Sequence, residues 1–329
     1  MDDSRTDPSS ARAVDLLDAG DHEAVAACLE RIETEAASSR KRTLRALRSL
    51  AEDRPAAFAS VVPALTPFLT DGERSIRLTT AKLLVAVAEA DPSAVVPALS
   101  ALADRLADDE EFYYVRARSA EALGYVALEH PDVASSPEVL ADLRIGLSFD
   151  EPEVREKLAK ALEHVALGDP RRLRHHVSTL VAHLDDDVEL VRYHLCTALA
   201  VVGCASPDSL VDGRTALVAR LDDDSPFVRG RAAEALGLLA RVDASVREAL
   251  DVLDDEEPFV AERTRFALGV DASRDERAGD PGTVDGIRAT TGDAVAAITT
   301  PNADGECRHC GLALPENGPP MCPRCGAPH

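Results

Sequence analysis

A dipeptide of one aliphatic residue and one arginine recurs along most of this 329-residue chain at nearly constant spacing. Its five copies are Ile76-Arg77, Val115-Arg116, Val154-Arg155, Val191-Arg192 and Val228-Arg229, with steps of 39, 39, 37 and 37 residues between the arginines. A sixth, degenerate copy, Val260-Ala261, lacks the arginine. A repeat of this length indicates one small structural unit that is stacked many times.

The residues that follow each arginine position repeat a helical pattern. Positions 3, 4, 6, 7, 10 and 11 after it are mostly small or apolar, which is the spacing of one face of an α-helix. Leucine stands seven positions after it in every copy: Leu84, Leu123, Leu162, Leu199, Leu236 and Leu268. A preceding helix is predicted in each unit, over 57–69, 94–106, 137–147, 173–184 and 210–221. Aspartate and serine in the acidic turn between the two are expected to cap the second helix.

Paired helices, a period of about 38 residues, an aspartate turn and a Val-Arg start of the second helix resemble HEAT repeats, in the variety similar to phycobilisome-lyase-type proteins. The resemblance covers residues 38–270 and implies an all-α fold, a right-handed α-solenoid of helical hairpins. Residues 1–37 are then predicted to be N-terminal capping helices. The resemblance also implies a hydrogen-bonded ladder between repeats, formed by Asp71, Arg77, Arg116, Arg155, Asp186, Arg192, Asp223 and Arg229.

In HEAT proteins the second helices line the concave side, and this resemblance indicates where a partner would bind. The column two residues after the arginine position is mostly basic in an acidic protein, and tyrosines lie near it. The candidate partner-binding residues are Arg118, Lys157, His194, Arg231, Arg263, Tyr125 and Tyr193. One interpretation is an exposed groove for an acidic protein tail or a nucleic-acid backbone. The other is self-neutralisation, because Arg118–Glu121 and Arg231–Glu234 are i,i+3 pairs on a helix.

The last residues carry two C-x-x-C pairs eleven residues apart, each followed by glycine. Four thiolates in this arrangement hold one tetrahedral Zn²⁺, and four protein ligands leave no open position for substrate. The predicted ligands are Cys307, Cys310, Cys322 and Cys325. Residues 305–329 resemble the short zinc ribbons at the ends of many prokaryotic proteins, which implies a structural zinc. Residues 271–304 are predicted to be a linker, in which 284–298 forms a short helix, or 294–298 a strand, that docks on the last repeat.

Charge and composition limit the classes of function. The net charge is −23, from 59 acidic and 36 basic residues, and only four of the basic residues are lysines. This composition is similar to that of haloarchaeal proteins. It also repels nucleic acid. The polar N-terminus and the lack of an apolar run of about 18 residues predict a cytoplasmic protein.

The sequence therefore predicts a non-catalytic scaffold that binds a protein partner along the concave face, with the zinc ribbon as a second contact module. The alternative is a nucleic-acid- or ribosome-associated factor. Neither a nucleophile–base pair nor a phosphate-binding loop is recognisable, so we expect no enzyme activity and no small-molecule substrate. The pattern does not identify the partner.

Overall fold

The computed structural model describes residues 8–251, 255–269 and 280–300. All regular elements in these ranges are helical, and no strand occurs in them. The chain divides into two compact units, Met1–Phe149 and Asp150–His329.

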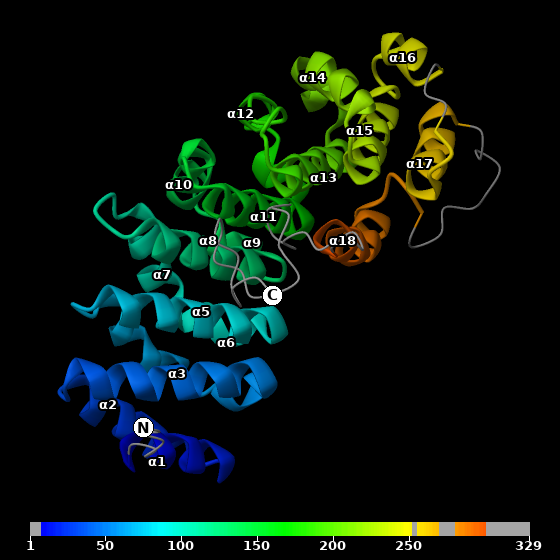
Figure 1. Ribbon diagram of the computed structural model, residues 1–329. Helices are drawn as coiled ribbons and strands as arrows, with labels where there is room; N and C mark the ends of the chain where they lie inside the picture. The colour runs from blue at the N-terminus through cyan, green and yellow to red at the C-terminus, as the bar shows by residue number, and fades with distance from the viewer. Residues whose placement is uncertain (1–7, 252–254, 270–279, 301–329) are drawn as a thin grey trace, which may run out of the picture. The chain divides into compact units, whose positions relative to one another are not determined.

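Long second helices stack side by side in the first unit. After α1 (Pro8–Asp18) and α2 (His22–Glu33), the stack runs through α3 (Ala37–Asp53), α5 (Arg74–Ala90) and α8 (Tyr113–Ala127) (Figure 1). The outer arms are α4 (Val62–Leu65), α6 (Pro92–Val95), α7 (Leu99–Ala107), α9 (Pro131–Ala134) and α10 (Pro137–Ile145), with 3₁₀ turns η1 (Pro55–Phe58), η2 (Thr66–Thr70), η3 (Val96–Ala98) and η4 (Gly146–Ser148).

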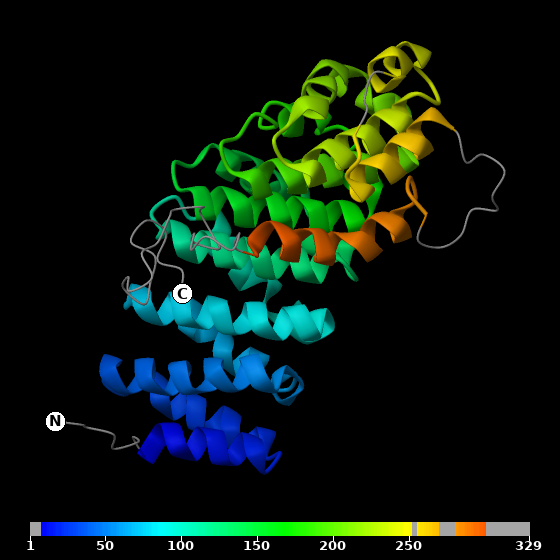
Figure 2. The same ribbon diagram turned by 45° about the vertical axis from the view of Figure 1, so that its right-hand side comes forward.

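The second unit continues the same plan. Its stack consists of α11 (Pro152–Gly168), α13 (Glu189–Ala205), α15 (Pro226–Leu239) and α17 (Pro258–Leu268). The outer arms are α12 (Val177–Val181), α14 (Arg214–Ala219) and α16 (Arg247–Asp251), with η5 (Pro170–Leu173), η6 (Pro207–Gly213), η7 (Arg220–Asp222) and η8 (Ala244–Val246). A further helix, α18 (Val284–Thr299), packs on α13, and the stack curves around it (Figures 1 and 2).

The first arm of each hairpin is not the continuous helix that the periodicity predicted. It consists of short α-helical and 3₁₀ segments, and in the first two hairpins their boundaries coincide with prolines such as Pro63, Pro67 and Pro97. Proline has no N–H for a helical hydrogen bond, and its ring collides with the preceding turn. The second helices carry proline only at their first position, as in α11, α15 and α17, and therefore stay continuous.

The repeated leucine column forms the core of the stack. Leu84, Leu123, Leu162, Leu199 and Leu236 are buried, whereas Leu268 at the end of α17 is half-buried. Small residues allow the helices to approach closely. At Gly237 an added Cβ would lie 2.6 Å from the Cα of Ala267, so α15 and α17 touch through their backbones there.

Arginines of the second helices form the ladder between neighbouring repeats. Arg192 donates from Nε and Nη2 to the two carboxylate oxygens of Asp223, at 2.8 and 2.9 Å, and from Nη1 to the carbonyl oxygen of Asp186 at 2.9 Å. The equivalent ion pairs are Arg40–Asp71, Arg77–Glu111, Arg155–Asp186 and Arg229–Asp255. Each arginine therefore joins the turn of its own repeat to the turn of the next.

The turn aspartates do not cap the second helices as expected. Asp71 accepts from the backbone N–H of Glu73 at 2.8 Å, and Asp223 accepts from that of Ser225 at 3.0 Å. These bonds to the residue two positions on are Asx turns, which shape the loop before the helix. Ser225 is the exception, because its hydroxyl accepts from Val228 and caps α15.

Two ladder positions differ from the sequence prediction. Arg40 was not recognised, although it lies 37 residues before Arg77, one repeat step away. Arg116 donates to the carbonyl oxygen of Leu106 at 2.9 Å, and its guanidinium carbon lies 4.8 Å from the ring centroid of Phe149. Arg116 therefore holds the outer arm of its own repeat and reaches the turn after η4 through the ring of Phe149.

The ion pair of Glu111 in the ladder is expected to make the stability of the protein depend on pH in the acid range. Burial raises the pKa of this carboxyl, but hydrogen bonds from Arg77 and the backbone N–H of Phe112 act against burial, and the pKa is lowered overall. A lowered folded pKa stabilises the protein above the unfolded value, about 4.3, and this stability is lost as pH falls through the folded pKa. We expect the urea midpoint to fall more steeply below about pH 4.3 in the wild type than in Glu111→Gln. Identical pH curves for the two chains would contradict this assignment.

Candidate functional site

Six of the seven predicted partner-binding side chains do not project from an open surface. Only Arg118 is partly exposed, with 17% of its side chain accessible. The others are buried: Tyr125 (9%), Lys157 (8%), Arg263 (2%), His194 (1%), Arg231 (0%) and Tyr193 (0%). The expectation that these side chains line an open groove is therefore wrong at these six positions. At Arg231 and Arg263 the reason is α18, which lies directly against them.

The two helical ion pairs of the alternative interpretation are both present. Arg118 donates to Glu121 at 2.7 Å, and Arg231 donates to Glu234 at 2.7 Å. Charge neutralisation in the column also uses other neighbours, because Lys157 pairs with Glu156 at 2.8 Å. The tyrosine hydroxyl of Tyr125 donates to Glu89 at 2.9 Å.

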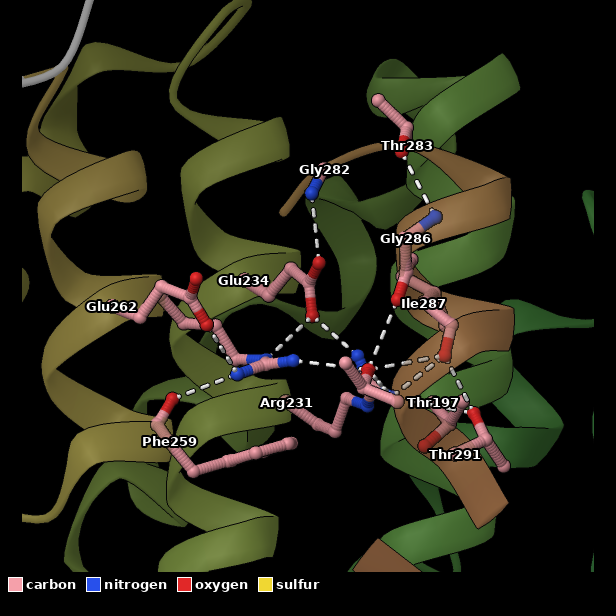
Figure 3. Close-up of polar contacts among 12 residues, drawn as sticks. Thr197, Arg231, Glu234, Phe259, Glu262, Gly282, Thr283, Gly286, Ile287 and Thr291 are labelled. Carbon is pink, nitrogen blue, oxygen red and sulfur yellow. Dashed lines mark hydrogen bonds and ion pairs between the residues drawn. The ribbon is translucent and has the colours of Figure 1, made fainter. Parts of the chain in front are cut away.

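The most elaborate polar arrangement lies where α15 and α17 face α18. We call it the inner cluster and define it as Tyr193, Arg231, Glu234 and Arg263. Figure 3 shows Arg231 and Glu234 of α15 between α17 and α18. Arg231 Nη2 lies within 2.9–3.3 Å of four oxygens: the carbonyl of Ile287, the hydroxyls of Thr290 and Thr291, and the hydroxyl of Tyr193. One NH₂ group has two hydrogens, so these acceptors share them.

Glu234 connects three separate segments of the chain. Its side chain is fully buried and accepts from Arg231 Nη1 at 2.7 Å and from Arg263 Nε at 3.1 Å. Its other oxygen accepts from the backbone N–H of Gly282 at 2.7 Å (Figure 3). The carboxylate therefore holds α15, α17 and the start of α18 together.

An aromatic ring stabilises the positive charge of the cluster, because the negative face of its π-system attracts a cation. The guanidinium carbon of Arg263 lies 3.4 Å from the ring centroid of Phe259, and that of Arg231 lies 5.3 Å from the same ring. Burial lowers the pKa of Arg263, while Glu234 raises it, and the net shift is downward. For Arg231 burial also acts downward, but Glu234 and Tyr193 outweigh it and the pKa is raised. Both guanidiniums stay charged at physiological pH.

The helix α18 begins with a tightly fitted turn. Thr283 caps it by accepting from the N–H of Gly286 at 3.0 Å. Gly282 has a φ of +78°, and an added Cβ would lie 2.0 Å from an atom of the Phe266 ring. Only glycine fits at this position, both for its backbone conformation and for the space against the ring.

Few apolar side chains anchor α18. Gly286, Ile287 and Ala294 are its only buried residues among the sixteen of the helix. Ile287 is the only large one, and burial of one such side chain stabilises docking by about 1.5–3 kcal/mol. Further along, Arg288 donates to the carbonyl oxygen of Leu167 at 2.7 Å. The sequence predicted either a helix over 284–298 or a strand over 294–298 for this segment. The segment is a helix, and it contacts α11, α13 and α15 as well as the last repeat.

Metal-binding groups of three or more His, Cys, Asp or Glu residues do not occur in the part of the chain that the structure describes. The predicted zinc ligands Cys307, Cys310, Cys322 and Cys325 lie outside the described residues. Burial raises the pKa of Cys196 and of Cys204 to about 12, so these two thiols stay protonated near neutral pH. Cys196 is a core residue and Cys204 is half-buried, and neither is in the thiolate form that a nucleophile needs.

Comparison with known proteins supports the repeat architecture. Residues 99–200 match the family model of HEAT repeats. No curated protein matches the chain. Among the described residues, no helix is both long enough and apolar enough to cross a membrane.

Solved structures of repeat proteins have the same fold. An engineered protein from a structural genomics consortium is 23% identical over 90% of this chain and 78% of its own, with a TM-score of 0.62. A designed armadillo repeat protein is 21% identical, and another, in complex with the peptide (KR)4, is 22% identical. Each covers 63% of this chain and 98% of its own, with a TM-score of 0.56. At this level of identity the similarity shows the fold alone, an all-α solenoid of HEAT-like repeats.

Proposed function

We propose that this protein is a non-catalytic scaffold that binds polypeptide segments on the faces of its second helices. One observation carries the proposal: the inner cluster already holds a helix, α18, through bonds to backbone groups. Arg231 donates to the carbonyl oxygen of Ile287, and Glu234 accepts from the N–H of Gly282. A similar fold is seen with a bound peptide in the designed armadillo repeat protein.

A second contact module is proposed at residues 305–329, where Cys307, Cys310, Cys322 and Cys325 would hold a structural Zn²⁺. Two weak contacts on one chain reinforce each other through effective concentration. The buried free thiols of Cys28 and Cys196 fit a reducing cytoplasm. The net charge of −23 fits a protein adapted to high salt, as in haloarchaea.

The geometry favours binding over catalysis. Ser93 and His130 form a serine–histidine hydrogen bond of 2.7 Å, at exposed hairpin ends. The described contacts of His130 include no carboxylate that would orient its ring for general-base catalysis.

Nucleic-acid binding is the second candidate, supported by the likeness of residues 305–329 to zinc ribbons. The burial of Arg231 and Arg263 and the net charge of −23 weigh against it.

A co-purification experiment tests the scaffold. The tagged full-length protein is recovered from nuclease-treated native lysate at its working salt, together with Arg118→Glu and Arg247→Glu chains. Arg118 is the candidate that keeps exposed surface, and Arg247 is an exposed arginine on an outer arm, α16. We expect one protein in stoichiometric amount, reduced at least tenfold by Arg118→Glu and unchanged by Arg247→Glu. Recovery of only nucleic-acid complexes from a parallel lysate without nuclease, and their loss once nuclease is added, would instead establish the second candidate.

A further inference from the structure

The interaction between α18 and the inner cluster has the character of a bound ligand and not of another repeat. The Arg-aliphatic repeat ends at the degenerate copy Val260-Ala261, and α18 follows it without that pattern. Three of the sixteen residues of α18 are buried, whereas the stacked helix α13 buries thirteen of seventeen. The hydrogen bonds that join α18 and the turn before it to the stack each use a backbone group or a hydroxyl group.

The net free energy of a hydrogen bond is small compared with its strength in isolation, because water replaces the partner when the contact is released. When α18 leaves, Arg231, Arg263 and Glu234 regain water, and their hydration offsets the lost hydrogen bonds. The fit is also incomplete, because Arg231 Nε is buried without a hydrogen-bond partner while α18 is in place. Four acceptors share one NH₂ group of the same arginine. The resident helix therefore satisfies its site only in part.

We propose that α18 is an exchangeable occupant of the inner cluster, which keeps the site closed until a partner helix of the same chemistry replaces it. This rests on the proposed scaffold function and names its partner class and its regulation. The partner is an N-capped helix with an aliphatic residue in its first turn and hydroxyl residues three and four positions later. In α18 these are Ile287, Thr290 and Thr291. The carbonyl oxygen of the aliphatic residue and the two hydroxyl oxygens accept from Arg231.

A substitution at Gly282 is expected to release α18 and so open the inner cluster. In Gly282→Ala the new methyl group would overlap the Phe266 ring, and the backbone would be strained at positive φ. The matched control is Gly269→Ala, which has a φ of +71° but nothing within 4 Å of an added Cβ. Gly269→Ala therefore introduces the same kind of backbone strain, but its new methyl group collides with no neighbour and does not disturb the turn before α18. Ile287→Ser is a second opening variant, located on α18 itself and outside the repeats.

The probe is a labelled synthetic peptide with the sequence of residues 280–300, titrated against full-length chains. We expect Gly282→Ala and Ile287→Ser chains to bind it at least tenfold more tightly than the wild type, and Gly269→Ala to bind it as the wild type does. A peptide carrying Ile287→Ser is expected to bind the opened chains at least tenfold more weakly. Amide exchange in 284–299 should be faster than in α13 in the wild type, and faster still in the opened chains.

Equal peptide affinity for all four chains would overturn the proposal. So would amide protection in 284–299 equal to that of α13, because α18 would then be a permanent part of the folded unit. The co-purification experiment is independent of both results. A partner that is lost with Arg118→Glu, together with no peptide binding by the opened chains, would leave the scaffold function standing and reject the exchange of α18.

Discussion

Glu234→Ala is expected to lower the free energy of unfolding by about 3–5 kcal/mol, the usual cost of removing one partner from a buried ion pair. The carboxylate is fully buried and pairs with both Arg231 and Arg263. Its removal leaves two guanidiniums inside the protein without the buried carboxylate that they share. It also removes the acceptor for the N–H of Gly282, so the start of α18 loses its attachment.

Glu262→Ala is the matched control for this variant. Glu262 also lies near Arg263, at 3.4 Å, but 54% of its side chain is exposed. An exposed ion pair contributes less than about 1 kcal/mol, because water and salt screen it. Chemical denaturation followed by circular dichroism gives both values. Equal losses in the two variants would show that burial does not determine the energetics of this cluster.

Removal of one predicted zinc ligand is expected to abolish zinc binding and to unfold the ribbon predicted at residues 305–329. Full-length protein should bind one equivalent of zinc, and Cys322→Ser should lose it on dialysis against a chelator. Structural zinc contributes roughly 10–16 kcal/mol to small modules of this kind, so the ribbon would unfold without it. The helical signal of the stacked repeats should remain, since the stack has its own core.

Cys204→Ser serves as the control for zinc content. Cys204 is a half-buried free cysteine of α13, distant in sequence from both C-x-x-C pairs. Metal analysis should give one zinc per chain for this variant, as for the wild type. Full zinc retention by Cys322→Ser would contradict the four-cysteine assignment, and the proposed second contact module would then need a different basis.

The sequence identified those parts of the site that are local. The i,i+3 spacing of Arg231 and Glu234 was sufficient to predict their ion pair. It did not indicate that Arg263, 29 residues further on, shares the same carboxylate, or that Gly282 donates to it from 48 residues away. Charged residues at these positions resembled an open basic groove, because no local pattern shows that a later segment covers them.

The ladder shows the same division between local and distant contacts. Four of its arginines, Arg77, Arg155, Arg192 and Arg229, follow from the repeat, and Arg40 would have followed from the 37-residue step that separates it from Arg77. The carboxylate that accepts from Arg77 could not be predicted from the repeat, because Glu111 occupies this turn where the other turns have an aspartate. The longer glutamate side chain reaches the same arginine from a different position in the turn.

The sequence by itself determined the repeat, the second helices and the faces they bury, because helical periodicity and the recurring Val-Arg pair are properties of neighbouring residues. Only the tertiary structure decided where α18 docks and which charges it buries. Its three buried residues, Gly286, Ile287 and Ala294, give too weak a pattern to choose between helix and strand. Its position depends on polar contacts with residues more than 25 positions away, whose energies exist only when the stack has formed.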